Sequence, residues 1–288
     1  MTNAGEEYHV YDYQVDLGGD SAPARVINLV KPNCKVLEIG AGPGSITRHL
    51  SGAKQCDVVA LEVDESAIRK LKPHARRIMA ADLNIANWAE QLADEAPFDY
   101  VIAADVLEHV LDPLAVLKGM KSLLGPKGSV ILSLPHVGHH AIIACLMDED
   151  FGYRDWGLLD RTHIRFFGVK NIEKLYAEAG LAIAEAQFVV RHPIETEFAE
   201  KWQKLSPELQ SALSANPYGH VYQVVSRAMV VANVATPIKL MEMPVESRGQ
   251  QTATLVAMGP ARAWARKNLS PDRRRKLLNW ARKIGLKI

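Results

Sequence analysis

Three polar residues that could perform chemistry lie close together in the second half of the chain. Asp160, His163 and Arg165 provide an acid, a base and a fixed cation within six positions. Histidine has a pKa suited to taking a proton from a hydroxyl group, so His163 is the first candidate for a general base. Asp160 and Arg165 suit a polar or anionic ligand. The alternative is a loop held by an ion pair, without a part in chemistry.

Other histidines follow expected strands. His109 lies in the segment LEHV, near a ligand or in a structural role at a helix start. His136, His139 and His140 follow a later strand, where they could contact an acceptor, act as a base, bind a metal or remain on the surface. A metal site would need a further ligand type with suitable geometry, so we expect no metal.

A glycine-rich turn offers a second kind of site. The apolar run Lys35–Ile39 is followed by Gly40, Gly42 and Gly44, and a helix is expected from about Ser45. Glycine lets the backbone approach a ligand closely, and a helix start offers N–H groups without intrahelical partners. The turn therefore predicts a ligand cradle at the end of a strand.

The elements that must position these residues alternate regularly. Strands are expected at 35–39, 57–62, 76–80, 98–104, 128–134, 181–190 and 218–231. Helices are expected at 21–30, 64–71, 84–93, 113–124, 141–147, 170–179 and over most of 194–216. Such alternation is typical of a parallel sheet with helices on both faces, which binds ligands at the carboxyl ends of its strands. The last two strands suit an antiparallel hairpin at the sheet edge.

Two segments outside this alternation are candidates to cover a ligand. Residues 137–168 contain glycine, aromatic and charged residues, and long connections of this kind are usually lids or binding loops. Residues 1–20 carry Tyr8, Tyr11 and Tyr13. These tyrosines form either a surface arm packed on the body or an aromatic cover over a ligand.

Four motifs together resemble the class I S-adenosylmethionine-dependent methyltransferases. They are VLEI followed by GAGPG, Glu62 at the end of the second strand, Asp82-Leu83 after the third, and DVLEH after the fourth. The rival interpretation of the glycine turn is a dinucleotide site with the pattern G-x-G-x-x-G. That pattern requires glycine where this chain has Ser45, and the third glycine falls at Gly44 instead.

The resemblance, which extends roughly over residues 21–235, implies a fold and a cofactor. The implied fold is an α/β, Rossmann-like, doubly wound sheet of seven mostly parallel strands with an antiparallel edge strand. The cofactor would be S-adenosyl-L-methionine. We therefore expect a methyltransferase domain at 1–235, with its lid or acceptor loop at about 137–168, and a linker with a basic amphipathic helical tail at 236–288.

The resemblance also assigns residues to the cofactor. Glu62 would accept hydrogen bonds from the ribose hydroxyls, unless it is a solvated strand end. Glu38 would help to hold the amino-acid end, or form a structural ion pair. Asp82 would accept from the adenine amine, or cap the next helix. The other implied cofactor residues are Gly40, Ala41, Gly42, Val63, Leu83, Ala104 and Asp105.

The stretch Leu158–Phe167, LLDRTHIRFF, resembles methyltransferases found with surface-polysaccharide and glycan assembly enzymes, although Gly168 stands where that group often has threonine. It implies methyl transfer to an oxygen of a sugar or glycan-type acceptor. The alternatives are O-methylation of a small aromatic or quinone-like metabolite, and a cofactor-fold protein without turnover. The implied catalytic residues are His163, His109 and Asp160, and the implied acceptor contacts are His136, His139 and Arg165.

Composition limits the class of protein. Hydrophobic residues make up 48% of the 288 residues, enough for a sizeable core. The chain has no run of 18 apolar residues, and its first 30 residues do not resemble a secretory signal. Three cysteines without C-x-x-C spacing favour a reducing compartment, so we expect a cytoplasmic protein.

The net charge of +1 conceals a basic C-terminal tail. Residues 261–288 carry ten Lys and Arg side chains and one acid, which leaves a charge of −8 on the other 260 residues. The tail could be a solvated helix face, a dock for an anionic membrane or lipid-linked substrate, or a contact with a partner protein or a second copy in a homodimer. Nucleic acid is disfavoured because the acidic body would repel a phosphate backbone.

Removal of residues 259–288 tests these interpretations. We expect the shortened protein to retain transfer to a soluble acceptor fragment, because the glycine turn and the candidate base lie outside the deletion. Binding to anionic lipid vesicles, measured by co-sedimentation, should fall because the ten basic side chains are lost. Unchanged vesicle binding would rule out the membrane interpretation.

Overall fold

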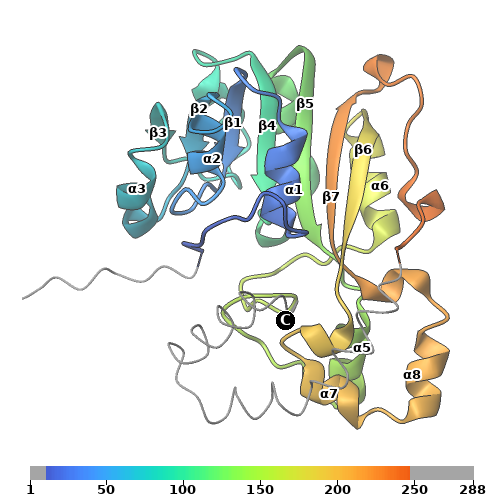
Figure 1. Cartoon of the computed structure of the whole chain (residues 1–288). Coiled ribbons are helices and arrows are strands. Elements are labelled where there is room, and N and C mark those ends of the chain that lie inside the picture. Colours follow the sequence, from blue (N-terminus) through green and yellow to red (C-terminus); the bar gives the residue numbers. More distant parts are fainter. Residues whose placement is uncertain (1–10, 247–288) are drawn as a thin grey trace, which may run out of the picture.

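The computed structural model describes residues 11–246, and its centre is one seven-stranded sheet (Figure 1). The strands are β1 (Lys35–Ile39), β2 (Asp57–Leu61), β3 (Arg77–Met79), β4 (Phe98–Ala104), β5 (Leu124–Pro135), β6 (Leu181–Val190) and β7 (Val221–Val230). Their order is β3-β2-β1-β4-β5-β7-β6. Strands β1 to β5 pair in parallel, and β7 pairs antiparallel with both β5 and β6. The predicted fold class is confirmed, including the antiparallel pairing at the edge.

The strand order explains where a ligand can bind. The chain runs from β1 outward to β2 and β3, then returns to β4 on the other side of β1. Connections that leave neighbouring parallel strands in opposite directions open a crevice at their carboxyl ends. The glycine turn after β1 and the DVLEH segment after β4 both begin at this crevice.

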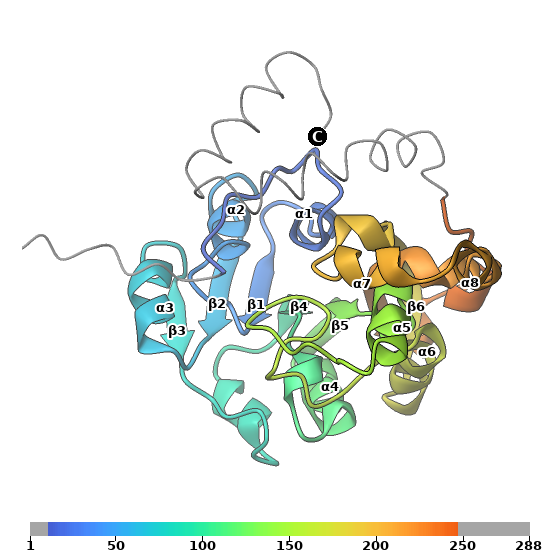
Figure 2. The ribbon, with the colours of Figure 1, turned by 90° about the horizontal axis from the view of Figure 1, so that it is seen from below.

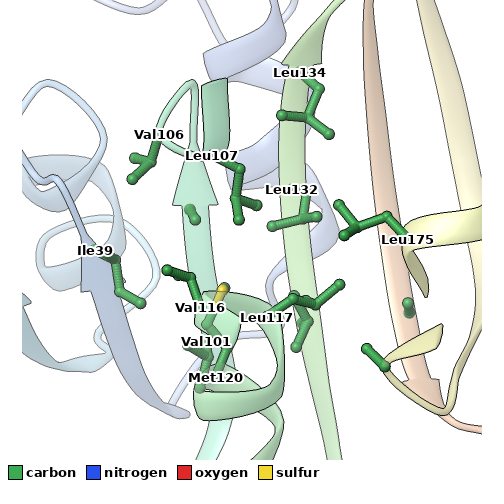
Figure 3. Close-up of a cluster of buried hydrophobic side chains, with 14 of the residues drawn as sticks. Ile39, Val101, Val106, Leu107, Val116, Leu117, Met120, Leu132, Leu134 and Leu175 are labelled. Carbon is green, nitrogen blue, oxygen red and sulfur yellow. The ribbon is translucent and has the colours of Figure 1, made fainter. Parts of the chain in front are cut away.

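Helices cover both faces of the sheet. They are α1 (Ala22–Leu29), α2 (Thr47–Ser51), α3 (Glu65–Leu71), α4 (Pro113–Ser122), α5 (His140–Met147), α6 (Val169–Glu178), α7 (Ala199–Lys204) and α8 (Pro207–Leu213). One apolar cluster joins α1 and α2 to the sheet, and another joins α4 and α6 to the opposite face. In Figure 3 Leu117 and Met120 of α4 and Leu175 of α6 lie against strand residues such as Val101 and Leu132. The core therefore consists of two layers separated by the sheet.

Local signals account for the ends of several helices. The Ser21 hydroxyl accepts from the Ala24 N–H at the start of α1, and the Asp64 carboxylate accepts from the Ser66 N–H at the start of α3.

The α-helix predicted at 84–93 is wrong, because the structure has only a 3₁₀ helix there, η1 (Trp88–Leu92). The Asp82 carboxylate accepts from the Asn84 N–H, and such local bonds compete with helix formation.

A separate group of elements lies beyond the carboxyl ends of the strands. Figure 1 shows α5, α7 and α8 gathered below the sheet, and in Figure 2 the loop from α5 to α6 crosses the ends of β4 and β5. This loop contains much of the segment predicted to cover a ligand. The helices predicted in the basic tail and Tyr8 lie outside the described residues. Within residues 11–246, no helix is both long and apolar enough to span a membrane.

At the edge of the sheet where the parallel strands begin, the buried carboxylate of Glu95 connects β1 and β3. Glu95 accepts from Arg76 Nη2 at 2.5 Å and from Arg77 Nη1 at 2.9 Å, and its Oε2 lies 3.5 Å from Lys35 Nζ. Lys35 begins β1 and Arg77 begins β3. The hydrogen bonds from Arg76 and then Arg77 hold the pKa of Glu95 at about 2.

This cluster predicts an acid-sensitive contribution to stability. The Glu95→Gln substitution should lower the free energy of unfolding by about 1–2 kcal/mol at neutral pH, a value discounted because the guanidinium groups are partly exposed. The folded pKa is depressed, so the contribution is present above about pH 5 and is lost as the pH falls toward 2. Urea unfolding at several pH values measures this difference.

The matched control is Asp94→Asn. Asp94 also pairs with Arg77, but its side chain is 63% exposed, so the substitution should change stability little. If Glu95→Gln and wild type unfold identically at neutral pH and at about pH 3, the proposed contribution is absent.

Candidate active site

A cavity of about 630 Å³ opens at the carboxyl ends of β1, β2 and β4. Most of the predicted site residues line it: Glu38, Gly40, Ala41, Gly42, Glu62, Val63, Ala104, Asp105, His109, Asp160 and His163. These residues come from segments more than one hundred positions apart in the sequence. The fold thus brings most of the predicted cofactor residues and the candidate base into one cavity.

The glycine turn has the backbone shape that glycine permits. Gly40, Gly42 and Gly44 have φ values of 65°, 54° and 88°, in the left-handed region. A Cβ atom at Gly40 would lie 2.8 Å from Val106 Cγ2, whereas one at Gly42 would meet no atom within 4 Å. The backbone at Gly42 therefore faces the open cavity, where a ligand can approach it closely.

Glu62 is fixed beside this turn by backbone donors. Its Oε2 accepts from the Gly42 N–H at 2.7 Å, and its Oε1 accepts from the N–H groups of Val63 and Asp64 at 2.7 and 2.8 Å. A carboxylate has about four acceptor positions, so one position of Glu62 remains for a hydroxyl donor from the cavity. This geometry fits a contact with one of the two ribose hydroxyls of the prediction.

Glu38 is buried at the end of β1 and meets a neutral partner. The Thr47 hydroxyl donates to Glu38 Oε2 at 2.6 Å. Burial raises the pKa of Glu38 to about 8, although the Thr47 hydrogen bond acts against this shift. The structure thus gives no support, within the described residues, to a structural ion pair at Glu38.

Asp105 is oriented by two other strands. It has a φ of 55°, and it accepts from Ser133 Oγ of β5 at 2.5 Å and from Gln223 Nε2 of β7 at 2.9 Å. Burial raises the pKa of Asp105, while the Ser133 and Gln223 hydrogen bonds lower it. A left-handed conformation at a residue other than glycine is costly, and it persists here under a network that fixes the side chain.

Glu108 lies in the wall of the cavity without a hydrogen-bond partner. It is fully buried in the 3₁₀ helix η2 (Leu107–His109), and neither carboxyl oxygen has a partner in the structure. His163 Nε2 lies 3.8 Å from Glu108 Oε1. Burial, reinforced by the nearby Asp105, raises the pKa of Glu108 well above its usual range.

The two cavity histidines are oriented by carbonyl groups. His163 Nδ1 lies 3.3 Å from the Leu158 carbonyl, and His109 Nδ1 lies 3.2 Å from the Thr162 carbonyl. These contacts assign a hydrogen to each Nδ1, which leaves each Nε2 as an acceptor. Burial lowers the pKa of His163, and the neighbouring His109 lowers it further. His163 is therefore neutral near pH 7 and able to take a proton.

Asp160 joins the long loop to the N-terminal segment. It accepts from the Thr162 hydroxyl at 2.6 Å and from the Tyr11 hydroxyl at 3.1 Å. Burial would raise the pKa of Asp160, but the hydrogen bonds from Thr162 and Tyr11 lower it below its usual range. Tyr11 and Tyr13 both line the cavity, which favours the aromatic cover over the surface arm.

Three predicted acceptor contacts do not line the cavity. His136 Nδ1 pairs with the Val221 carbonyl at 3.1 Å. His139 is fully buried as the cap of α5, where its Nδ1 accepts from the Ala141 N–H and its Nε2 donates to the Arg191 carbonyl. Arg165 donates to the Leu111 carbonyl at 2.6 Å. Their hydrogen bonds point to structural roles, and the structure does not support the predicted acceptor contacts.

Asp82 and Leu83 also lie outside the cavity lining. Asp82 is exposed after β3 and accepts from the Asn84 N–H at 2.9 Å, as in the capping alternative, while Leu83 packs against the core. The adenine contact of Asp82 stays a prediction.

One group of side chains could hold a metal ion. Ligand atoms of Glu108, His109 and His163 all lie within 4.8 Å of one another. The predicted alternative of a metal at His136, His139 and His140 has no such grouping in the described part of the chain.

The sequence did not single out Glu108, Tyr222 or Gln223, which also line the cavity. Glu108 belongs to the DVLEH motif, and the N–H groups of Ile164 and Arg165 in the long loop donate to its backbone carbonyl. Tyr222 and Gln223 lie in β7, far along the chain from β4, and carry no local signal.

Comparison with known proteins identifies the family. A family model described as a methyltransferase domain matches residues 18–186. Two relatives, each named ubiquinone biosynthesis O-methyltransferase, come from Bradyrhizobium diazoefficiens and Neisseria meningitidis. The first is 29% identical over 211 residues, covering 70% of this chain and 76% of that protein. The second is 25% identical over 175 residues, covering 57% of this chain and 71% of that protein.

Among solved structures, a methyltransferase from Thermotoga maritima, titled a possible histamine N-methyltransferase, has a TM-score of 0.49 and 16% identity, covering 73% of this chain and 88% of that one. The family match spans more than half of the chain and includes the glycine turn, Glu62 and the DVLEH segment. The chain therefore belongs to the methyltransferase-domain family and is a class I S-adenosylmethionine-dependent methyltransferase.

Proposed function

We propose that this chain methylates a hydroxyl oxygen of a small aromatic or quinone-like molecule. The observation that carries the proposal is a single cavity that contains the glycine turn, Glu62 and an imidazole with a free acceptor atom. The relatives named ubiquinone biosynthesis O-methyltransferases support oxygen as the methylated atom and a quinone-like molecule as the acceptor.

The cofactor would be held at the side of the cavity formed by β1 and β2. Gly42 allows close backbone approach, and Glu62 offers its remaining acceptor position. Bound S-adenosylmethionine supplies an activated methyl group on a cationic sulfur. The carboxyl groups of Glu38 and Asp105 line the same cavity, and a positively charged ligand there would favour their ionised forms.

His163 would take the proton of the acceptor hydroxyl. Its Nε2 is an acceptor, and its side chain is only 6% exposed, so the proton has a defined destination away from bulk water. As the acceptor oxygen forms its bond to the methyl carbon, the sulfur–carbon bond breaks and the hydroxyl proton moves to His163 Nε2. Most of the acceleration would come from holding the two reactants in line, which can contribute about 7–11 kcal/mol.

A sugar or glycan hydroxyl is the second candidate acceptor. Polar side chains from Glu108, His109, Asp160 and His163 line the acceptor side of the cavity, and they suit a molecule with several hydroxyl groups. The similarity of Leu158–Phe167 to glycan-associated methyltransferases supports the same candidate. This candidate shares the reaction and the base with the first.

Methyl-labelled cofactor distinguishes the two candidates. The full chain is incubated with labelled S-adenosylmethionine and with separate extracts of phenolic metabolites and glycans, and the products are identified by mass spectrometry. We expect label on an oxygen of a phenolic or quinone-like product. Label on a sugar would select the second candidate, and label on nitrogen or carbon would contradict both.

Glu62 is predicted to dominate cofactor affinity. The Glu62→Ala substitution should weaken binding of S-adenosylmethionine at least about tenfold, because it removes an acceptor for the ribose and releases three backbone donors near the turn. Isothermal titration calorimetry measures the affinity. The control is Glu65→Ala, at an exposed position of α3, which should bind as wild type does. Affinity near that of wild type for Glu62→Ala would refute the ribose contact.

His163 is predicted to act on turnover rather than on cofactor affinity. The His163→Ala substitution should lower kcat by about 10²–10⁴, the usual range for a lost general base, with cofactor affinity nearly unchanged. Single-turnover assays with labelled cofactor measure this. Arg165→Ala is the control on the same loop, because Arg165 lies outside the cavity lining. Full turnover in His163→Ala would mean that the proton leaves by another route.

A further inference from the structure

Glu197 does not line the cavity itself, but it contacts residues of two of its walls. It lies between the 3₁₀ helix η3 (Pro193–Glu195) and α7. Its Oε1 accepts from the Leu158 N–H at 2.8 Å, and its Oε2 accepts from the Tyr222 hydroxyl at 3.2 Å. Leu158 belongs to the long loop between α5 and α6, whereas Tyr222 belongs to β7 and lines the cavity. One carboxylate therefore joins the loop to the sheet.

The loop comes very close to Glu197 at a glycine. Gly157, which lines the cavity, has a φ of 92°, in the left-handed region. A Cβ atom at this position would also clash with Glu197 Oε1. The contact is supported by packing, because Leu158 and Phe198 share one apolar cluster and the Arg154 guanidinium lies 5.1 Å from the centre of the Phe198 ring. The loop is thus docked on the segment that carries Glu197.

The loop residue that binds Glu197 also orients the candidate base. Leu158 donates its N–H to Glu197 and offers its carbonyl to His163 Nδ1 at 3.3 Å. Beyond His163, the N–H groups of the next two residues donate to the Glu108 carbonyl. His163 is therefore held between two anchors of the loop, and the anchor that precedes it depends on Glu197.

The donors that meet Glu197 depend on its carboxylate. Burial raises the pKa of Tyr222 well above its usual range, and the nearby Glu197 raises it further, so the phenol keeps its proton and donates. Leu158 is buried. Loss of the carboxylate would take an acceptor away from a buried N–H and from this hydroxyl, which favours a rearrangement of the loop.

We propose that Glu197 is a positioning residue for methyl transfer: it fixes the loop through the Leu158 N–H and thereby holds the His163 imidazole in place in the cavity. Glu197 lies outside the cavity lining, so it acts through other residues. A displacement of a reacting group by about 1 Å can lower a rate about 10²-fold, so such an anchor matters for turnover. This inference rests on the proposed O-methylation, because it assigns the residue that orients the candidate base of that reaction.

Kinetics of the full chain test the positioning role. Transfer from labelled S-adenosylmethionine is measured with a fixed amount of the extract, phenolic or glycan, that receives label. Glu197→Ala should lower the apparent kcat about 10–100-fold and leave the KM for the cofactor within about twofold of wild type. Glu197→Gln should stay within about threefold of wild type, because its amide oxygen can still accept from the Leu158 N–H. The control is Glu200→Ala, at an exposed position of α7, which should match wild type.

A double-mutant cycle with His163→Ala tests whether Glu197 acts through the imidazole. Residues that act as one unit have non-additive effects, so Glu197→Ala should slow the His163→Ala protein by less than about threefold. Effects that multiply in full would mean that Glu197 acts independently of His163, and would overturn the inference. Glu197→Asp keeps the charge on a shorter side chain and should also lower the apparent kcat, so it replaces Glu197→Ala if that protein does not fold.

Hydrogen exchange measured by mass spectrometry needs no acceptor. In the full chain saturated with S-adenosylhomocysteine, Glu197→Ala should speed exchange in peptides from residues 154–163 at least about tenfold and leave peptides from β4 unchanged. Glu197→Gln and Glu200→Ala should keep the wild-type protection. Unchanged exchange in Glu197→Ala would overturn the inference. Faster exchange without label in any extract would mean that the proposed transfer fails while Glu197 still fixes the loop, so the two failures can be told apart.

Discussion

The carboxylate of Glu62 connects the glycine turn after β1 to the backbone that follows β2, and the shape of this side of the cavity depends on it. It holds the Gly42 N–H of the turn after β1 and the two N–H groups that follow β2. These hydrogen bonds stabilise a left-handed backbone that only glycine adopts without strain. The cradle is therefore formed by the ends of two neighbouring strands, and its shape follows from their parallel pairing.

A second network fixes the acceptor side. Asp105 leaves β4 in a left-handed conformation and is held by Ser133 of β5 and Gln223 of β7. The turn that follows carries Glu108, whose carbonyl accepts from the N–H groups of Ile164 and Arg165 in the long loop. Residues of β5, β7 and the long loop thus contact Asp105 and the turn that follows β4.

The sequence was sufficient for the sheet and for most of the strand-end residues that line the cavity, because both depend on local patterns. Buried apolar runs and glycine turns marked the strands within a few residues, although β5 begins at Leu124 rather than at 128. The sequence did not predict which side chains point into the cavity, because that direction depends on tertiary packing. It suggested His136 and His139 as acceptor contacts, but their burial and their hydrogen bonds to the carbonyls of Val221 and Arg191 are tertiary properties. It also passed over Glu108, whose burial in the cavity wall is a tertiary property.

The proposed acceptor and the cavity lining differ in polarity. A quinone-like ring needs apolar surface, whereas the residues around His163 are mainly polar. The two are compatible if the lining recognises the hydroxyl groups and the rest of the acceptor lies toward the cavity mouth. Tyr11 and Tyr13 line the same cavity and offer aromatic surface, and the Tyr11 hydroxyl donates to Asp160. On this view the polar lining defines which oxygen is methylated, and the aromatic cover accommodates the remainder of the molecule.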